Sequence, residues 1–302
     1  MRHAILGPGG IGGLVGALLT HSGESVDVIV RPASVDRYPR TLAVQHASQE
    51  YSGPVAVAAT LSQPVDVLWI TVKATDLEPA LASIPPTAAV ATVVPLLNGV
   101  DHIARLRERF GRAQVVPATI AVESERTAPG RIAWRSPFAR LNLSSAGRDR
   151  LAATVAIFTA LGWECRFVDD EITLMWSKLV FLAPLALSTT AAAAPVGQVL
   201  SQTASSVELK ELVIEACSVA AASGANVQVD RVLDQFSRLP PGMRSSMQKD
   251  VESGHAPELD AIAGPILRGA ATFGFPAPTT ARLVRQIEAM TAAKSAPHST
   301  AS

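Results

Sequence analysis

Lys178 stands near the start of an almost wholly apolar stretch, residues 176–187. A lysine ammonium in water has a pKa of about 10.4, and burial or a neighbouring cation lowers that pKa. With a lowered pKa, Lys178 could stabilise negative charge that develops on an oxygen during a reaction and then donate a proton to it. The alternative interpretation is a surface lysine at the end of a helix.

The glycine-rich segment at residues 6–13 is a second chemical signal. It contains the pattern Gly-x-Gly-x-x-Gly directly after an expected strand and at the start of an expected helix. In Rossmann-type units the first glycine allows a tight turn, the second lets a pyrophosphate approach the backbone, and the third lets the helix pack on the strand. Free N–H groups at the helix N-terminus bind the phosphates. A glycine-rich turn without a ligand is the alternative, and the strand–loop–helix–strand setting argues against it. The predicted cofactor-binding residues here are Gly7, Pro8, Gly9, Gly10, Ile11 and Gly12.

The residue after the second expected strand indicates which dinucleotide binds. An acidic residue there would suit the ribose 2′-hydroxyl of NAD, whereas an arginine suits the 2′-phosphate of NADP. This chain has Arg31 at that place. Asp27 lies within the strand and is the competing candidate for a ribose contact. We predict NADP, in its reduced form NADPH, as the cofactor.

Five short segments, in their order and spacing, resemble the ketopantoate reductase (2-dehydropantoate 2-reductase) family, and the resemblance extends from residue 2 to about residue 290. It implies an α/β N-terminal domain of the Rossmann type and an all-α C-terminal domain similar to that of 6-phosphogluconate dehydrogenases. It also implies NADPH-dependent reduction of a 2-keto acid to a 2-hydroxy acid, 2-dehydropantoate to pantoate, in pantothenate biosynthesis. The segments are Ile70-Thr-Val-Lys73-Ala74, Leu97-Asn98-Gly99, Trp176-Ser-Lys178-Leu179, Ser245-Ser246-Met247 with Asp250, and Pro257-Glu258-Leu259-Asp260.

The resemblance also implies roles for particular side chains. Lys178 matches the family's general acid, and Glu258 matches the glutamate that engages the substrate's hydroxyl; these two are the predicted catalytic residues. Ser246 matches a substrate-binding serine, and Asn98 matches an asparagine that contacts both cofactor and substrate. Lys73 matches a cofactor-binding lysine, and the arginine after the second strand matches the family's NADP-type arginine. Acidic residues and serines are also common at helix starts for structural reasons alone.

The family pattern is broken at three positions. Where the family usually has asparagines, this chain has Leu182, Ala186 and Val196. A lost hydrogen bond to a substrate polar group costs about 1–3 kcal/mol. We therefore expect a more apolar substrate pocket than in a dedicated ketopantoate reductase. Two alternatives stay open: a reductase of the same fold that acts on a more apolar ketone or imine, and a non-catalytic NADPH-binding protein.

The elements that position these residues change in character along the chain. Up to residue 110, strands alternate with helices, which predicts a parallel sheet with right-handed crossovers. Residues 115–144 predict an antiparallel extension of that sheet, and a helix follows at 148–161. Helical apolar spacing then recurs at 174–187, 206–222, 229–236, 259–273 and 279–290. We predict an NADP-binding domain over residues 1–167, a helical substrate and catalytic domain over 168–290, and a disordered tail over 291–302.

The composition limits the partners. With 48% apolar residues, the 302-residue chain can form substantial cores. The 26 basic and 26 acidic residues balance, so charge offers no argument for nucleic acid or an anionic membrane as partner. The two cysteines form no disulfide framework, and no histidines have metal-ligand spacing, so no metal is expected. We expect a cytoplasmic protein, without a signal peptide or membrane span, that binds a small 2-keto acid as a monomer or as a homodimer.

Overall fold

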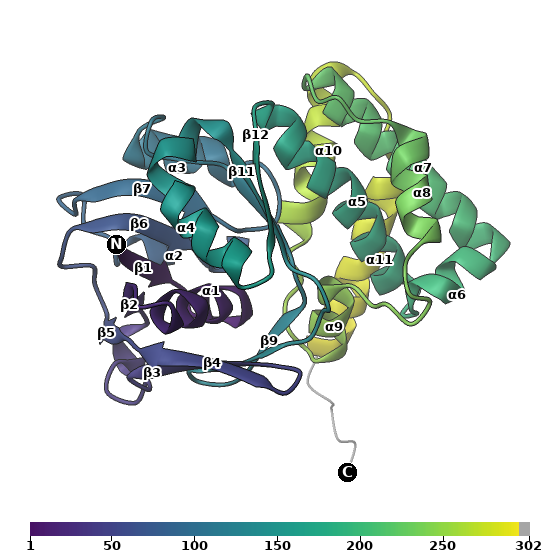
Figure 1. Cartoon of the computed structure of the whole chain (residues 1–302). Helices are drawn as coiled ribbons and strands as arrows, with labels where there is room; N and C mark the ends of the chain where they lie inside the picture. Colours follow the sequence, from purple (N-terminus) through teal and green to yellow (C-terminus); the bar gives the residue numbers. More distant parts are fainter. Residues whose placement is uncertain (296–302) are drawn as a thin grey trace, which may run out of the picture. The chain divides into compact units, whose positions relative to one another are not determined.

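The computed structural model describes residues 1–295, which form two compact units (Figure 1). The first unit comprises Met1–Leu97 and Asp101–Leu174, and the second comprises Asn98–Val100 and the chain from Met175 onward. The predicted boundary after residue 167 therefore falls a few residues before this division. The prediction also placed Asn98 in the first domain, whereas its contacts assign it to the second unit.

A five-stranded parallel sheet forms the centre of the first unit, as the alternation of strands and helices predicted. The strand order reverses between the first strand and its neighbour on the other side, which is the place where open α/β sheets bind ligands, beyond the carboxyl ends of the strands. The predicted Rossmann-type α/β class is confirmed. In spatial order the strands are β5 (Ala56–Ala58), β2 (Ser25–Ile29), β1 (Arg2–Leu6), β6 (Val65–Ile70) and β7 (Val90–Pro95).

Helix α1 (Gly10–His21) is buried along most of its length, from Gly12 to Thr20. A helix that is apolar all round must be covered on more than one side. A Cβ added at Gly16 would lie 2.7 Å from Leu42 Cδ1 and 3.3 Å from Ile5 Cγ1, so α1 packs between the parallel sheet and a second sheet (Figure 1). That second sheet has the order β4 (Gln49–Pro54), β3 (Thr41–His46), β10 (Arg131–Trp134) and β9 (Ser124–Ala128).

The prediction of antiparallel strands within residues 115–144 is confirmed for the pair β9–β10 and for the pair β8 (Ala118–Ala121) and β11 (Arg140–Ser144), but the prediction that they extend the parallel sheet was wrong. These residues contribute to two other sheets, and β10 pairs parallel with β3. The β3–β4 hairpin was missed because β4 is mostly polar and largely exposed, so it lacks a strong alternating pattern. Pairing partners depend on tertiary packing that a local pattern does not contain. The third sheet has the order β12 (Glu164–Val168), β11 and β8.

The remaining elements of the first unit are helical. The helical segment after β6 is short and begins with a 3-10 turn. The helix predicted at 148–161 is present within one residue of its predicted ends. The elements are η1 (Pro32–Ser34), η2 (Ala74–Asp76), α2 (Leu77–Leu81), α3 (His102–Phe110), η3 (Ser145–Gly147) and α4 (Arg148–Ala160).

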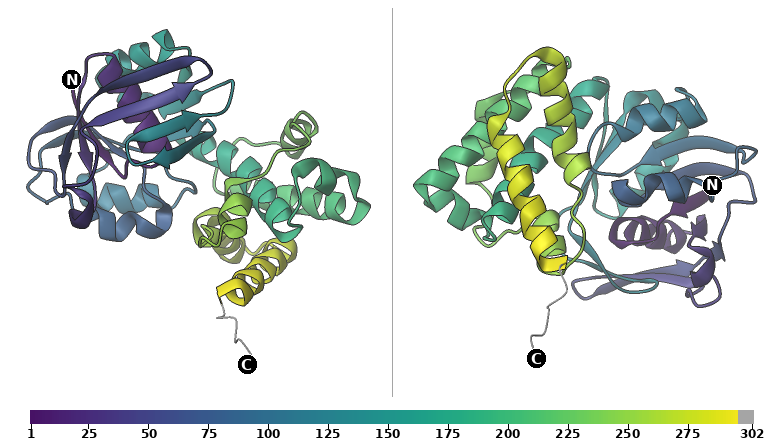
Figure 2. Two further views of the ribbon diagram at one scale, coloured as in Figure 1. Left: turned by 90° about the horizontal axis from the view of Figure 1, so that it is seen from below. Right: turned by 180° about the vertical axis from the view of Figure 1, so that it is seen from behind.

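The described part of the second unit consists of helices and their connections (Figure 2). Every predicted helix of this part is present, and the all-α class is confirmed. The predicted disorder from residue 291 was wrong for residues 291–295, which continue the last helix; residues 296–302 lie outside the described residues. The helices are α5 (Glu171–Ala191), which starts within the first unit, α6 (Val196–Ser201), α7 (Thr203–Ala222), α8 (Val229–Ser237), α9 (Ser246–Glu252), α10 (Leu259–Phe273) and α11 (Pro278–Ser295).

Helix α5 is long and apolar enough, by length and composition alone, to cross a membrane. In the structure, 67% of the apolar 18-residue stretch of this helix is buried within the protein. Leu179, Ala183 and Leu187 of α5 belong to the core of the second unit. Packing in this core accounts for the apolar character of the helix.

Candidate active site

The glycine loop between β1 and α1 has different steric requirements at each glycine. Gly7 has φ +86°, a left-handed conformation that favours glycine, and an added Cβ would overlap Val72. An added Cβ at Gly12 would overlap Thr71 Oγ1 and Ile5. At Gly9, by contrast, it would meet only a carbonyl oxygen 3.9 Å away. The fold therefore requires glycine at the first and third positions, whereas the second faces open space beside the first turn of α1.

Thr71, which the sequence analysis did not single out, supports this loop. Its hydroxyl lies 2.8 Å from Gly7 O and 3.0 Å from Leu6 O, and its N–H donates to Leu6 O at 3.0 Å. Its position in the sequence could have indicated this role: Thr71 directly follows β6, and β6 is the neighbour of β1 at the point where the strand order reverses. Ser124 was also missed; its hydroxyl is buried without a hydrogen-bond partner among the described residues, and its carbonyl lies close to Gly10.

The other predicted cofactor residues lie beyond the carboxyl ends of β2 and β6. The side chain of Arg31 is 83% exposed, and its guanidinium lies 3.7 Å from Asp76 Oδ2. Asp27 is 6% exposed and accepts hydrogen bonds from Arg2 Nε and Nη2 at 3.0 and 2.8 Å. Because Arg2 already engages that carboxylate, Asp27 is poorly suited to bind a ribose. Lys73 is exposed directly before η2.

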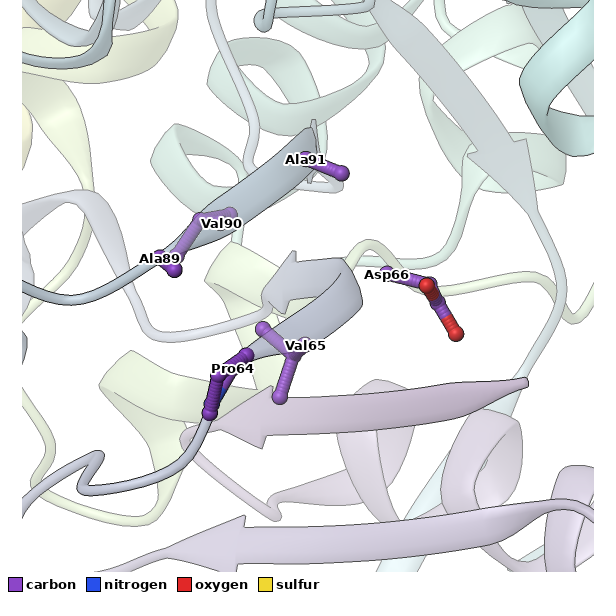
Figure 3. A pocket seen from close by; sticks show the side chains of 6 residues that line it. All are labelled: Pro64, Val65, Asp66, Ala89, Val90 and Ala91. Atoms are coloured by element: carbon purple, nitrogen blue, oxygen red, sulfur yellow. The ribbon is translucent and has the colours of Figure 1, made fainter.

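A surface depression occurs at the opposite end of the parallel sheet (Figure 3). It lies where β6 and β7 begin, whereas the glycine loop follows the carboxyl end of the parallel strand β1. Open α/β sheets bind nucleotides at the carboxyl ends of their strands, so this depression is not the expected cofactor site. Its lining residues are Pro64, Val65, Asp66, Ala89, Val90 and Ala91.

Lys178 lies about two turns inside α5 and not at its head, because the helix begins earlier than the sequence suggested, at Glu171. Asp170 caps that start: Asp170 Oδ2 accepts a hydrogen bond from Thr173 Oγ1 at 2.6 Å, and Asp170 Oδ1 accepts one from Thr173 N at 2.9 Å. These two hydrogen bonds lower the pKa of the Asp170 carboxyl. The Lys178 side chain is only partly exposed. Burial lowers the pKa of Lys178 to about 8, and attraction to the carboxylate of Glu258 partly opposes this. The environment of Lys178 differs from that of a solvated lysine at a helix end.

Asn98 and Glu258, which are 160 residues apart in the sequence, meet in the second unit. Asn98 Nδ2 donates a hydrogen bond to Glu258 Oε2 at 3.2 Å. The close approach depends on Gly99, which has φ +88° and whose added Cβ would overlap Ala261 O in the first turn of α10. Glu258 is the N-cap residue of α10, where a negative charge is favourable. Because the Glu258 carboxylate also attracts the Lys178 ammonium, we group the amide, the carboxylate and the ammonium as one polar cluster.

Ser246 is the first residue of α9 and is exposed. The helix-capping interpretation applies instead to Ser245, whose hydroxyl accepts a hydrogen bond from Gln248 N at 3.1 Å. The Ser246 hydroxyl is therefore not used for capping. It makes no hydrogen bond within the described residues.

The three positions that depart from the family pattern differ in accessibility. Ala186 and Val196 are 0% exposed and belong to the core of the second unit. Leu182 is partly exposed and lies one helical turn after Lys178, on the same face of α5. The expectation of a more apolar pocket therefore depends mainly on Leu182. No group of three or more His, Cys, Asp or Glu side chains that could hold a metal occurs within residues 1–295.

Comparison with known proteins gives matches over most of the chain. The family models described as "Ketopantoate reductase PanE/ApbA" and "Ketopantoate reductase PanE/ApbA C terminal" match residues 3–147 and 171–291. A 2-dehydropantoate 2-reductase of Caulobacter vibrioides is 29% identical over 293 residues, which cover 95% of this chain and 98% of the relative.

Solved structures share the fold. A PanE/ApbA family ketopantoate reductase from Ralstonia eutropha JMP134 has a TM-score of 0.84 at 24% identity, covering 97% of this chain and 99% of that one. A D-mandelate dehydrogenase in a ternary structure with NADH and anilino(oxo)acetate has a TM-score of 0.84 at 20% identity, with the same coverage. At these identities the structural likeness concerns the fold.

Proposed function

The chain belongs to the ketopantoate reductase family, and we propose that it reduces 2-dehydropantoate to pantoate with NADPH. The observation that carries the proposal is the cluster of Lys178, Glu258 and Asn98 in the second unit, in a chain whose first unit contains a glycine loop shaped for a dinucleotide. A curated relative named 2-dehydropantoate 2-reductase matches this chain along 98% of its own length, and this match supports the choice of substrate.

The residues of the first unit fit a dinucleotide. The space beside Gly9 is open, and the first turn of α1 has N–H groups without intrahelical partners, which suit phosphate oxygens. Residues 7–12 and Lys73 would hold the diphosphate portion, and bound NADPH would supply the hydride that is added to the keto carbon. Arg31, exposed after β2, would pair with the 2′-phosphate, which favours NADPH over NADH.

In the second unit, Lys178 would act as the general acid. Reduction of a ketone places negative charge on the carbonyl oxygen, and a protonated Lys178 Nζ can stabilise this charge and then donate its proton. A pKa of about 8 leaves the amine largely protonated at pH 7, yet makes it a better acid than a solvated lysine. A protein that only binds NADPH has no need of such a group.

Three further side chains would hold the substrate. The Glu258 carboxylate would accept a hydrogen bond from the substrate hydroxyl, and Asn98, which donates to that carboxylate, would orient it. Asn98 would also contact both cofactor and substrate. The Ser246 hydroxyl, which has no partner within the described residues, would contribute another substrate contact.

One observation favours a second candidate substrate within the same reaction class. Leu182 presents a partly exposed apolar side chain one turn from Lys178, where it would suit a 2-keto acid with an apolar side chain. The curated relatives named 2-dehydropantoate 2-reductase favour ketopantoate.

We propose a cytoplasmic enzyme that acts on a small keto acid, as a monomer or as a homodimer.

The direct test is NADPH oxidation by the purified protein with a panel of 2-keto acids that includes ketopantoate and acids with bulkier apolar side chains. Turnover of ketopantoate with the highest kcat/KM of the panel supports the main proposal. A higher kcat/KM for an apolar 2-keto acid supports the second candidate. Binding of NADPH, followed by fluorescence, without turnover of any member would contradict the enzymatic proposal.

A further inference from the structure

Two buried hydroxyl groups connect the helix that carries Lys178 to the helix that begins with Ser246. Thr189 Oγ1 on α5 lies 2.8 Å from Ser245 Oγ, the N-cap of α9. Thr189 is 0% exposed and Ser245 is 3% exposed. Neither hydroxyl can replace a lost partner with bulk water, so their hydrogen bond is costly to remove.

The direction of this hydrogen bond follows from the protons available. Each hydroxyl has one proton and can accept further hydrogen bonds. Thr189 donates its proton to Leu185 O at 2.7 Å, and Ser245 Oγ accepts from Gln248 N at 3.1 Å. Ser245 therefore donates to Thr189. The result is a continuous series of hydrogen bonds that runs from Gln248 N in the first turn of α9, through the two hydroxyls, to Leu185 O in the backbone of α5.

The segment before α9 is held mainly through its backbone. Val196 N donates to Met243 O at 2.9 Å, and Gly197 N donates to Pro241 O at 2.9 Å. The last residue held in this way, Met243, lies two residues before the N-cap residue Ser245. Helix α9 has only seven residues, and so short a helix depends on tertiary contacts for its position. The hydroxyl pair provides such a contact at the point where α9 begins.

We propose that Thr189 is a positioning residue for substrate binding: through Ser245 it holds the start of α9 in the orientation in which Ser246 can meet the 2-keto acid. The inference rests on the proposed function, because it requires that Ser246 contact the substrate. Thr189 itself touches neither reacting atoms nor substrate in this scheme. Its effect is therefore expected in substrate affinity and not in the chemical step.

The test compares steady-state kinetics of the full chain with NADPH and ketopantoate, or whichever 2-keto acid the wild type turns over best. Thr189→Val keeps the shape of the side chain and removes the hydroxyl. We expect its KM for the keto acid to rise about three- to tenfold, as for loss of one hydrogen bond, with kcat changed less than about twofold. The Kd for NADPH should stay unchanged. Thr189→Ser should restore a KM close to the wild-type value.

The matched control is Thr190→Val, one residue further along α5. Thr190 is 1% exposed, and its hydroxyl has no hydrogen-bond partner among the described residues, so this variant makes the same change without breaking the hydroxyl pair. Its KM should equal that of the wild type. A similar rise in KM for both valine variants would show a packing effect and overturn the positioning role.

Further outcomes separate the positioning role from the proposed function. A normal KM in Thr189→Val overturns the positioning role while the proposed function stands, whereas a wild-type protein that turns over no 2-keto acid overturns the function and with it this inference. If Ser246→Ala leaves KM unchanged, the positioning role is also overturned. Should Thr189→Val not fold, Ser245→Gly removes the other hydroxyl at an N-cap position where glycine is tolerated; a raised KM then supports the proposal and a normal KM contradicts it.

Discussion

The glycine loop of the first unit and the polar cluster of the second differ in how the chain builds them. The loop occupies consecutive residues, 7–12, and its shape follows from steric limits on neighbouring backbone atoms. The cluster joins Asn98 to Glu258 across 160 residues and adds Lys178 from a third segment. A site made of local backbone can be predicted from spacing, whereas a site made of distant side chains becomes chemically meaningful only after folding.

The same difference appears in the physical property that each site uses. Gly9 and Gly12 act through the absence of a side chain, which a sequence states directly. Lys178 is proposed to act through its ammonium group, whose pKa the surroundings lower to about 8. The predictions below test whether each region depends on the property assigned to it.

The largest expected effect is on the cluster. Lys178→Met removes the proposed general acid, so we expect kcat to fall by about 10²- to 10⁴-fold while the Kd for NADPH stays unchanged. Lys178→Arg, which keeps a positive charge but is a far weaker acid, should recover little activity if proton donation is the main role. Lys210→Met on α7, an exposed lysine of the same unit, is the control and should retain full activity. Stopped-flow or steady-state NADPH oxidation measures the rates, and a fluorescence titration measures the affinity.

The next effect separates two glycines of the loop. Gly12→Ala forces a methyl group against Thr71 and should destabilise the protein by about 1–3 kcal/mol, which thermal unfolding would detect. Gly9→Ala meets no close atom and should leave the melting temperature unchanged. It should nevertheless weaken NADPH binding by at least about tenfold, equivalent to about 1.4 kcal/mol, because the methyl group occupies the open space assigned to phosphate. Normal NADPH affinity in Gly9→Ala would contradict the assigned phosphate site.

Arg31→Ala tests the choice of cofactor. A charge-assisted hydrogen bond is worth about 1.5–3 kcal/mol, so we expect NADPH affinity to fall by about tenfold or more, with little change for NADH. Arg37→Ala, a nearby exposed arginine, should change neither affinity. Equal losses of affinity for NADPH and NADH would indicate that Arg31 does not bind the 2′-phosphate.

The pH dependence tests the environment of Lys178. If the protonated amine is the general acid, as proposed, kcat/KM should fall as pH rises through about 8, because kcat/KM reports the pKa of the free enzyme. In the unfolded chain the pKa of this lysine is about 10.4, so between pH 8 and 10.4 the unfolded state binds more protons than the folded state, and the contribution of Lys178 to stability rises with pH. Below pH 8 the buried charge opposes folding. Lys178→Met should therefore be at least as stable as the wild type at pH 7, and a fall in kcat/KM centred near pH 10 would contradict the lowered pKa.

The smallest effect concerns substrate choice. Leu182→Asn replaces the accessible apolar side chain near Lys178 with an amide, which should raise kcat/KM for ketopantoate relative to an apolar 2-keto acid by up to about tenfold. Ala186→Asn places a polar amide at a position that is 0% exposed, so its main expected effect is lower stability. An unchanged substrate ratio in Leu182→Asn would show that Leu182 does not line the substrate site.

Much of this protein was predictable from its sequence. The alternation of strands and helices, the glycine loop and the long helical second half all depend on short-range periodicity and backbone sterics, and the structure contains each of them. The tertiary structure alone decided which strands of residues 115–144 pair, because pairing depends on surfaces distant in sequence. It also placed Lys178 inside α5, joined Asn98 to Glu258 through the close approach at Gly99, and left Leu182 accessible while burying Ala186 and Val196. Burial and contact between distant residues are properties of the packed chain, and they determine what a lysine or a leucine can do.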